Sequence, residues 1–384
     1  MSPPTPRAEV VVDLDAVRHN VAILSGSAAA SGAATMVVVK ADGYGHGAVD
    51  VATAALQSGA SWLGVCSVAE SLQLRDGGID APVLAWLHAP TEDLAPAVAA
   101  GVDVGIYSRS QLAAASAAAV ATGRTVRVHL KIDTGLSRGG AMPAEWEALV
   151  RSAAAAHGVE VAAVWSHLAH ADDPGHPVIE RQLERFARAY DIALAAGLRP
   201  LRHLANSAAT LTRPDLHFDI VRPGIAVYGL SPVDGEGYGL RPAMTLRSQV
   251  ALLKRVPPGE GVSYGHEWTT DRETILALVP AGYADGIPRV LTGRLQVWLA
   301  GRQRPVVGRV SMDQVMVDCG SNSGPGAVAE GDEVVFFGPG DRGEPTAAQW
   351  AQMLGTIHYE VVAGMVRPRL TRTVLGRRPL AAAR

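Results

Sequence analysis

The stretch MVVVKADGYGHGA, residues 36–48, joins an apolar, β-branched run to a lysine and then to three closely spaced glycines. A continuous apolar run of this kind predicts a strand buried on both faces, as in a parallel sheet. Helical spacing follows over residues 48–59 and ends at a glycine, a common helix stop. The stretch therefore predicts one strand-then-helix unit, with Lys40 at the carboxyl end of its strand.

The same unit recurs through the first 240 residues. Further strand-like runs begin at Trp62, Pro82, Val102, Val126, Val161, Leu201 and Phe218. Helical segments separate most of them, and the clearest cover residues 109–123 and 179–197. About eight such units within roughly 230 residues predict an α/β fold, a parallel (β/α)8 barrel of the TIM type. A doubly wound open sheet is the alternative, because periodicity alone does not establish closure.

The pattern of predicted elements changes near residue 240. Strand-like runs then follow one another without intervening helices and are bounded by Gly, Pro and Asp turns, which predicts a mainly antiparallel β domain. We therefore expect a tail at residues 1–8, the barrel at 9–240 and the β domain at 241–384. Residues 9–14 are also strand-like, which makes them candidates for pairing with the β domain.

Composition narrows the range of partners. The net charge is −3 and basic residues are dispersed, so the chain has no electrostatic footprint for nucleic acid or a membrane surface. The sequence contains no apolar run long enough to cross a bilayer and no signal-peptide segment at its start. Two distant cysteines, Cys66 and Cys319, indicate buried thiols rather than a disulfide framework. We expect a cytoplasmic protein that acts on a small molecule.

Lys40 is the first candidate for chemistry. Active sites of barrels are built at the carboxyl ends of the strands, where this amine is expected. Burial against an apolar wall lowers the pKa of an amine and leaves a nucleophile suited to Schiff-base formation. Gly43, Gly45 and Gly47 would let the backbone approach an anion closely. The alternatives are a lysine that reaches into solvent and a dinucleotide loop, although the glycine spacing does not match that fingerprint.

The string around Lys40 resembles the cofactor-lysine signature of the alanine racemases, a fold-type III pyridoxal-phosphate family. Further strings similar to that family follow in order along nearly the whole chain: KIDTGLSRGG, WSHLAHAD, NSAATL, VRPGIAVYGL, VSYGHEW, GYADG, GRVSMDQVMVD and TIHYEV. The resemblance implies an isomerase that interconverts L-alanine and D-alanine with pyridoxal 5'-phosphate, and that supplies D-alanine for peptidoglycan.

The same resemblance assigns residues to the cofactor. It implies that Lys40 carries the cofactor and that the phosphate is held by Tyr44, Ser207, Gly224, Ile225 and Tyr359. It further places Asn206, His167, Arg222 and Trp86 around the cofactor. Ser207 and Gly224 follow the seventh and eighth expected strands, where barrels commonly bind phosphate. A simple helix cap is the alternative role of Ser207.

Arg222 is implied to face the pyridine nitrogen of the cofactor. Arginine does not readily lend a proton, because its ordinary pKa exceeds about 12. The ring nitrogen should then stay largely unprotonated, which favours return of the substrate proton over transamination. Without the resemblance, Arg222 would be interpreted as an ion-pair partner at a strand end.

Racemisation needs a proton removed from one face of the substrate carbon and another delivered to the opposite face. The resemblance gives these roles to Lys40 and Tyr264. A phenol needs nearby positive charge before it can act as a base. In this family the tyrosine comes from the other subunit, which implies a homodimer with two shared sites. A core aromatic is the alternative role of Tyr264.

Substrate contacts are implied for four further residues. Arg138 would reach the cofactor phenolate and the substrate carboxylate, a task suited to its forked donors. Met312 and Asp313 resemble the segment that meets the carboxylate across the interface, and Tyr283 a tyrosine that narrows the entrance. Lys131 matches a lysine that is carbamylated in several family members; an ordinary pairing with an acidic neighbour is the alternative.

Three other interpretations concern a metal site, a different substrate range and a non-catalytic role. His170, Asp172, Asp173 and His176 follow His167, but their spacing is not that of a helical zinc motif, and we expect no metal. A racemase for serine or for a broader range of amino acids stays open. A non-catalytic pyridoxal-phosphate protein would lack the β-domain strings VSYGHEW and SMDQ, and both are present.

Overall fold

The computed structural model describes residues 6–324 and 326–378, which form two compact units. One unit comprises residues 6–14 and Pro242–Arg377, and the other comprises Asp15–Arg241 with Arg378. Residues 1–5 of the expected tail and residues 379–384 of the expected β domain lie outside the described residues. We refer to the units below as the β unit and the barrel unit.

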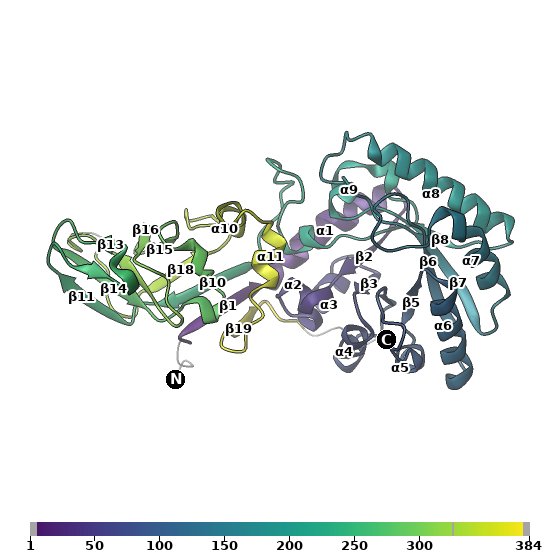
Figure 1. The fold of residues 1–384 in the computed structure, drawn as a ribbon, viewed down its shortest axis with the longest axis horizontal. Helices are drawn as coiled ribbons and strands as arrows, with labels where there is room; N and C mark the ends of the chain where they lie inside the picture. The colour runs from purple at the N-terminus through teal and green to yellow at the C-terminus, as the bar shows by residue number, and fades with distance from the viewer. Residues whose placement is uncertain (1–5, 325, 379–384) are drawn as a thin grey trace. The chain divides into compact units, whose positions relative to one another are not determined.

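Eight parallel strands build the barrel unit (Figure 1), in the order β8-β7-β6-β5-β4-β3-β2-β9. They are β2 (Ala34–Val38), β3 (Trp62–Val65), β4 (Val83–Ala85), β5 (Asp103–Ile106), β6 (Val126–Lys131), β7 (Val159–Trp165), β8 (Leu201–His203) and β9 (Ile220–Val221). The Asp219 N–H donates to the Arg202 carbonyl at 3.1 Å, and the Arg222 N–H to the Ala205 carbonyl at 2.9 Å. These bonds join the segments around β8 and β9, which are the two ends of this strand order, so the barrel is nearly closed. The predicted barrel is confirmed and the open-sheet alternative is wrong.

Helices alternate with the strands. They are α1 (Leu14–Ala30), α2 (Lys40–Tyr44), α3 (Ala48–Leu56), α4 (Val68–Asp76), α5 (Ala95–Ala99), α6 (Arg109–Thr122), α7 (Pro143–Ala155), α8 (Val178–Ala195) and α9 (Ser207–Thr212). In Figure 1, α6, α7 and α8 lie outside the strands. Helix α8 buries one apolar face that includes Ile179, Phe186 and Ala189 and leaves its charged residues in solvent, as expected for a helix that packs on a sheet.

Glycines make room inside the barrel. A Cβ atom on Gly64 would lie 2.5 Å from the Trp86 ring, and one on Gly105 would lie 2.8 Å from the Trp86 Cα. The Trp86 side chain also packs against the buried cluster of Met36, Leu84 and Ile220. Gly64 therefore leaves space for the Trp86 ring, and Gly105 lets the backbone at Trp86 approach closely.

The β unit contains a nine-stranded sheet in the order β11-β14-β17-β16-β15-β18-β10-β1-β19. Its strands are β1 (Ala8–Asp13), β10 (Met244–Gln249), β11 (Leu252–Val256), β14 (Thr274–Val279), β15 (Gln296–Leu299), β16 (Arg302–Val307), β17 (Val315–Asp318), β18 (Glu333–Phe337) and β19 (Thr371–Leu375). A small second sheet pairs β12 (Gly261–Val262) with β13 (Trp268–Thr269), and the unit also contains two α-helices, α10 (Ala347–Leu354) and α11 (His358–Ala363). Three short 3-10 helices in its described residues cover Tyr264–His266, Tyr283–Asp285 and Arg289–Leu291. All neighbours in the large sheet are antiparallel except β1 and β19.

The first strand of the chain belongs to this late sheet. Val10 of β1 lies opposite Leu246 of β10 in antiparallel register and opposite Arg372 of β19 in parallel register. The five residues Ala8–Val12 are all buried, and β1 lies between β10 and β19 in the sheet. None of the helices in the described ranges is long and apolar enough to cross a membrane.

Candidate active site

Lys40 begins a sharp left-handed turn at the end of the first barrel strand. β2 ends at Val38, and Ala41, Asp42, Gly43 and Tyr44 have φ angles of 52°, 52°, 63° and 51°. Backbone hydrogen bonds from Gly43 to Val39 and from Gly45 to Ala41 hold the turn. Only glycine adopts this conformation without a steric penalty, so the three non-glycine residues of the turn, Ala41, Asp42 and Tyr44, store strain close to the lysine.

Glu70 secures this turn. Its carboxylate accepts hydrogen bonds from the Ala41 N–H and the Cys66 N–H, both at 2.7 Å, and from the Ser67 N–H at 3.0 Å. Glu70 lies in the first turn of α4 and forms a capping box with Ser67. One carboxylate therefore fixes the residue after Lys40 to the end of β3. Glu70 is not among the residues predicted from the sequence, although Ser67 and Glu70 form a Ser-x-x-Glu capping pattern there.

The Lys40 amine is half-buried, and burial is the main cause that lowers its pKa. The positive charge of Arg138 lowers the pKa further, while Cys66 and Glu70 oppose the shift. Its Nζ lies 5.8 Å from the centre of the Tyr44 ring. A depressed pKa leaves more of the amine unprotonated and nucleophilic near neutral pH.

A buried polar cup lies next to this turn. The Ser207 hydroxyl accepts hydrogen bonds from the Gly224 N–H at 2.8 Å and from the Ala226 N–H at 3.4 Å. A Cβ atom on Gly224 would lie 2.5 Å from the Tyr44 hydroxyl, so that hydroxyl reaches the same place. Tyr44, Ser207, Gly224 and Ile225 are all buried. Two hydroxyls and loop amides thus converge where a glycine leaves space.

Asn206 caps the short helix that follows. Its side chain accepts a hydrogen bond from the Ala209 N–H at 3.1 Å, and it is the N-cap residue of α9. Ser207 is therefore not the cap, and its hydroxyl is directed toward Gly224 instead.

Arg222 is buried at the end of β9, with 4% of its surface exposed. It donates to His203 Nδ1 at 3.0 Å, to the Ser166 carbonyl at 2.8 Å and to the Leu204 carbonyl at 3.3 Å, and its guanidinium lies 4.9 Å from the Trp165 ring centre. Burial lowers the pKa of Arg222 to about 9. Trp165 and His203 were missed as site residues, although both end strands that the sequence predicted.

His167 lies half-buried among these cations. Burial is the first cause that lowers its pKa to about 3, followed by the charges of Arg222, Arg138, Lys131 and Lys40. The imidazole is therefore neutral at physiological pH. Four cationic residues predicted from the sequence therefore lie close enough to His167 to lower its pKa: Lys40, Lys131, Arg138 and Arg222.

Lys131 and Arg138 flank one loop. Burial, and next the charges of Arg222 and Arg138, lower the pKa of Lys131 to about 8, and its Nζ lies 4.5 Å from the Trp165 ring centre. Asp133 accepts hydrogen bonds from the N–H groups of Gly135, Leu136 and Ser137 rather than pairing with Lys131. This turn fixes the backbone that carries the exposed Arg138.

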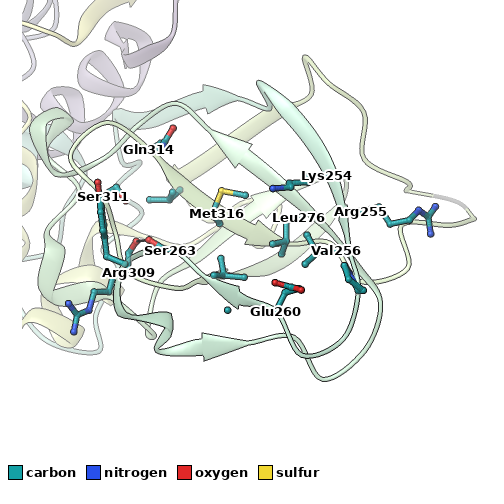
Figure 2. Close-up of a pocket in the computed structure, with 15 residues that line it drawn as sticks. Lys254, Arg255, Val256, Glu260, Ser263, Leu276, Arg309, Ser311, Gln314 and Met316 are labelled. Carbon is teal, nitrogen blue, oxygen red and sulfur yellow. Dashed lines mark hydrogen bonds between the residues drawn. The ribbon is translucent and has the colours of Figure 1, made fainter.

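The remaining predicted residues belong to the β unit. Tyr264 begins a short 3-10 turn and is 71% exposed; it lines a cavity of about 460 Å³ (Figure 2), together with Ser263, Arg309, Ser311 and Met316. Ser263 has a φ of 62° and donates to the Arg309 carbonyl at 2.8 Å, which fixes the backbone before Tyr264. The phenol is thus presented to solvent and not buried in a core.

Tyr283 and Met312 lie on adjoining segments. The Tyr283 N–H donates to the Ser311 carbonyl and the Ala284 N–H to the Met312 carbonyl, both at 3.0 Å. A Cβ atom on Gly282 would lie 2.3 Å from the Ser311 carbonyl oxygen, so only glycine permits this approach. The side chains of Tyr283 and Met312 are both exposed. Asp313 forms an ion pair with Arg369 at 2.7 Å. Tyr359 is a half-buried residue of α11.

Comparison with known proteins supplies the family. Residues 12–232 match the model "Alanine racemase, N-terminal domain", and residues 243–374 match "Alanine racemase, C-terminal domain". The chain belongs to the alanine racemase family. The family expected from the sequence motifs is confirmed, and with it the expectation of an isomerase.

Relatives of this family span the whole chain. A curated alanine racemase of Salinispora arenicola is 55% identical over 377 residues, which cover 97% of this chain and 100% of the relative. The crystal structure of alanine racemase from D-cycloserine-producing Streptomyces lavendulae has a TM-score of 0.92 at 48% identity and covers 97% of this chain and 98% of its own. The alanine racemase of Bacillus anthracis with bound L-Ala-P has a TM-score of 0.87 at 34% identity, covering 97% and 96% of the two chains.

The barrel unit of this alanine racemase family member fits pyridoxal phosphate. The hydroxyls of Tyr44 and Ser207 converge on the backbone at Gly224, and hydroxyl donors placed in this way suit a phosphate. Of the five N–H donors of Arg222, the contacts to described residues use three, which leaves donors for a ring nitrogen. Among the described residues, no group of three or more His, Cys, Asp or Glu side chains is arranged to hold a metal ion.

Proposed function

We propose that this chain interconverts L-alanine and D-alanine by a two-base mechanism, with pyridoxal 5'-phosphate bound in the barrel unit through Lys40. The observation that carries the proposal is a set of three groups in the barrel unit: a half-buried amine with a lowered pKa, a polar cup at Gly224, and a buried arginine with N–H donors that no described residue uses. When bound, the cofactor would supply an electron sink that acidifies the Cα–H bond of the substrate.

The cofactor would be held at both ends by residues of this chain. Tyr44, Ser207, Gly224 and Ile225 would hold the phosphate, with Tyr359 added from the β unit. Arg222 would donate to the ring nitrogen, and because it is a poor proton donor it would leave that nitrogen unprotonated. Trp86, His167 and Asn206 are proposed to line the remaining walls of the cofactor site.

Lys40 and Tyr264 are proposed to move the two protons. Lys40 is suited to act as a base near neutral pH, because burial lowers the pKa of its amine. Arg138 supplies a forked donor for the substrate carboxylate, and the backbone of Met312 and Asp313 is proposed to meet the same carboxylate. Tyr283 is proposed to narrow the entrance and so favour a small side chain.

A homodimer with shared sites is part of the proposal. Tyr264 and Met312 are 71% and 51% exposed, which suits side chains that reach toward another copy of the chain. The supply of D-alanine for peptidoglycan and a cytoplasmic location belong to the same proposal. Carbamylation of Lys131 is proposed as well, since only an unprotonated amine reacts with carbon dioxide and the pKa of Lys131 is lowered to about 8.

The first test is racemisation itself. Purified enzyme is expected to convert L-alanine into D-alanine, measured with a D-amino-acid assay, and faster than it converts serine. Tyr264→Phe is expected to lower the rate by about 10²- to 10⁴-fold, the usual contribution of a positioned proton donor or acceptor. The variant should still exchange the α-proton of one enantiomer with deuterated water. Tyr190→Phe, on helix α8, is the matched control and should behave as wild type.

Mixing two inactive variants tests the shared site. Lys40→Ala and Tyr264→Phe each remove one base. In a mixed dimer with shared sites, one site regains both bases, so random mixing should restore about one quarter of wild-type activity. No recovery after complete subunit exchange would refute the shared site, and a Tyr264→Phe enzyme as fast as wild type would refute the two-base assignment.

A further inference from the structure

A chain of four buried side chains runs through the barrel from one end of the strands to the other. His129 Nε2 lies 3.0 Å from Asp103 Oδ2, and His129 Nδ1 lies 2.9 Å from His203 Nε2. His203 Nδ1 lies 3.0 Å from Arg222 Nη1. Asp103 is the first residue of β5, whereas Arg222 follows the last residue of β9. None of the four side chains belongs to the surface, since each residue is at most 4% exposed.

Only one arrangement of protons satisfies this chain. Arginine has donors only, so His203 Nδ1 must accept. A neutral His203 then carries its proton on Nε2 and donates it to His129 Nδ1. His129 in turn carries its proton on Nε2 and donates it to the Asp103 carboxylate. Both imidazoles are therefore neutral, in agreement with burial that lowers the pKa of His203 well below its ordinary value.

Neighbouring rings hold the two imidazoles in these orientations. The Trp165 ring stacks on His203, with centroids 5.4 Å apart and planes 13° apart, and Trp62 contacts the edge of His129 at 5.7 Å. Neither histidine can rotate without displacing a tryptophan from a packed interior. The orientation of each hydrogen bond is thus fixed by packing as well as by the proton count.

Arg222 needs such a chain because its other acceptors are neutral. Besides His203 it bonds two backbone carbonyls, and no carboxylate among the described residues forms an ion pair with it. Its neighbourhood is cationic, since Arg222 lowers the pKa of both Lys131 and His167. A buried cation without a nearby anion is costly, and the anion that ends this chain offsets part of that cost.

We propose that Asp103 is a positioning residue for Arg222: across the barrel, and through two neutral histidines, it fixes the direction in which the guanidinium points its remaining N–H donors. The inference rests on the proposed function, which puts those donors against the cofactor ring nitrogen. At the other end of the chain, Asp103 Oδ2 also lies 3.7 Å from Nε of Arg127, whose side chain is 40% exposed. A half-exposed cation thus lies beside the buried carboxylate at this end of the chain.

Removing the Asp103 carboxylate should change the direction in which the two histidines donate their protons. In Asp103→Ala, His129 Nε2 loses its acceptor, and the Nδ1–H tautomer becomes available. If His129 takes that tautomer, its Nδ1–H meets the Nε2–H of His203, and His203 then carries its proton on Nδ1, facing the Arg222 donors. Without the carboxylate, each arrangement leaves one buried donor of the chain without an acceptor. Two facing donors repel, and Arg222 should turn away. Asp103→Asn keeps an oxygen acceptor at the same place and should preserve the chain, with a smaller effect.

Imidazole-nitrogen NMR of the histidine-labelled holoenzyme reads the tautomers directly, with His203→Gln used for assignment. Wild type and Asp103→Asn should show protons on Nε2 of both histidines, and Asp103→Ala should not. Cofactor affinity, measured by titrating the apoenzyme and following cofactor absorbance, should fall several-fold to about tenfold in Asp103→Ala and less in Asp103→Asn. The matched control is Asp318→Ala, which removes a buried, ion-paired carboxylate from the β unit. It should lower thermal stability while leaving tautomers and affinity unchanged.

A wild-type His203 protonated on Nδ1 would overturn the proposal even if Asp103→Ala failed to fold. Unchanged tautomers and affinity in a folded Asp103→Ala would overturn it as well. The proposed function fails separately. A wild-type enzyme that has the expected tautomers but does not racemise alanine refutes the proposed function. An active wild-type enzyme whose Asp103→Ala variant keeps the same tautomers and cofactor affinity refutes only the role of Asp103.

Discussion

Gly224→Ala tests the phosphate cup by adding one carbon. The new Cβ would lie 2.5 Å from the Tyr44 hydroxyl oxygen, 3.2 Å from Tyr44 Cζ and 3.6 Å from Val38 Cβ. Comfortable contacts between such heavy atoms are about 3.5 Å, so the Tyr44 hydroxyl must move by about 1 Å. The ring cannot retreat freely, because it packs on Tyr228 with centroids 4.8 Å apart.

The size of the effect follows from that overlap. Inserting a methyl group into a packed site costs about 1–3 kcal/mol. If the cost falls on the cofactor-bound state, where Tyr44 must keep its place, the dissociation constant for pyridoxal phosphate should rise on the order of 5- to 150-fold, since about 1.4 kcal/mol is a factor of ten. If it falls on the empty protein, Tm decreases instead.

The assay is a titration of apoenzyme with pyridoxal phosphate, followed by cofactor absorbance, together with thermal melting of both forms. Gly224→Ala combined with Tyr44→Phe removes the oxygen that collides and should recover part of the lost Tm of the apoenzyme. A Gly224→Ala protein with unchanged Tm and unchanged cofactor affinity would show that no Tyr44 hydroxyl lies against Gly224, and the cup would be wrong.

Two further substitutions test the surroundings of Lys40. Burial lowers the pKa of Lys131 to about 8, so the unfolded chain binds this proton more tightly than the folded one and stability is regained as pH rises from about 8 toward the ordinary value of 10.5. Lys131→Met should therefore melt at a higher temperature than wild-type apoenzyme with an uncarbamylated Lys131 at pH 7, and the gap in Tm should close as pH rises through that window. A gap independent of pH would contradict the burial of this charge. Ala41 has a φ of 52° and a ψ of 49°, so Ala41→Gly should raise the free energy of unfolding by about 0.5–1 kcal/mol in urea denaturation. Ala48→Gly, at the start of the right-handed helix α3, should lower it, and equal signs for the two changes would refute the left-handed turn.

Local patterns in the sequence determined the elements of the barrel. The apolar run before Lys40, the helix after it and the repetition of that pair required only neighbouring residues, because hydrophobic period and glycine stops act within one element. The motif strings likewise identified the family from residues that are neighbours in the sequence. The turn at residues 41–44 was signalled by glycines, yet its left-handed course through Ala41 and Asp42 was not, since these residues rarely adopt it.

Only the tertiary structure decided what is distant in sequence. Closure depends on the hydrogen bonds between the β8 and β9 segments, which an open sheet with the same periodicity would lack. Pairing of β1 with β10 and β19 joins residues more than 200 positions apart, and no short-range pattern specifies such a partner. The chain from Asp103 to Arg222 draws on four different strands or strand ends. Its members become neighbours only because the barrel turns all their side chains into one interior.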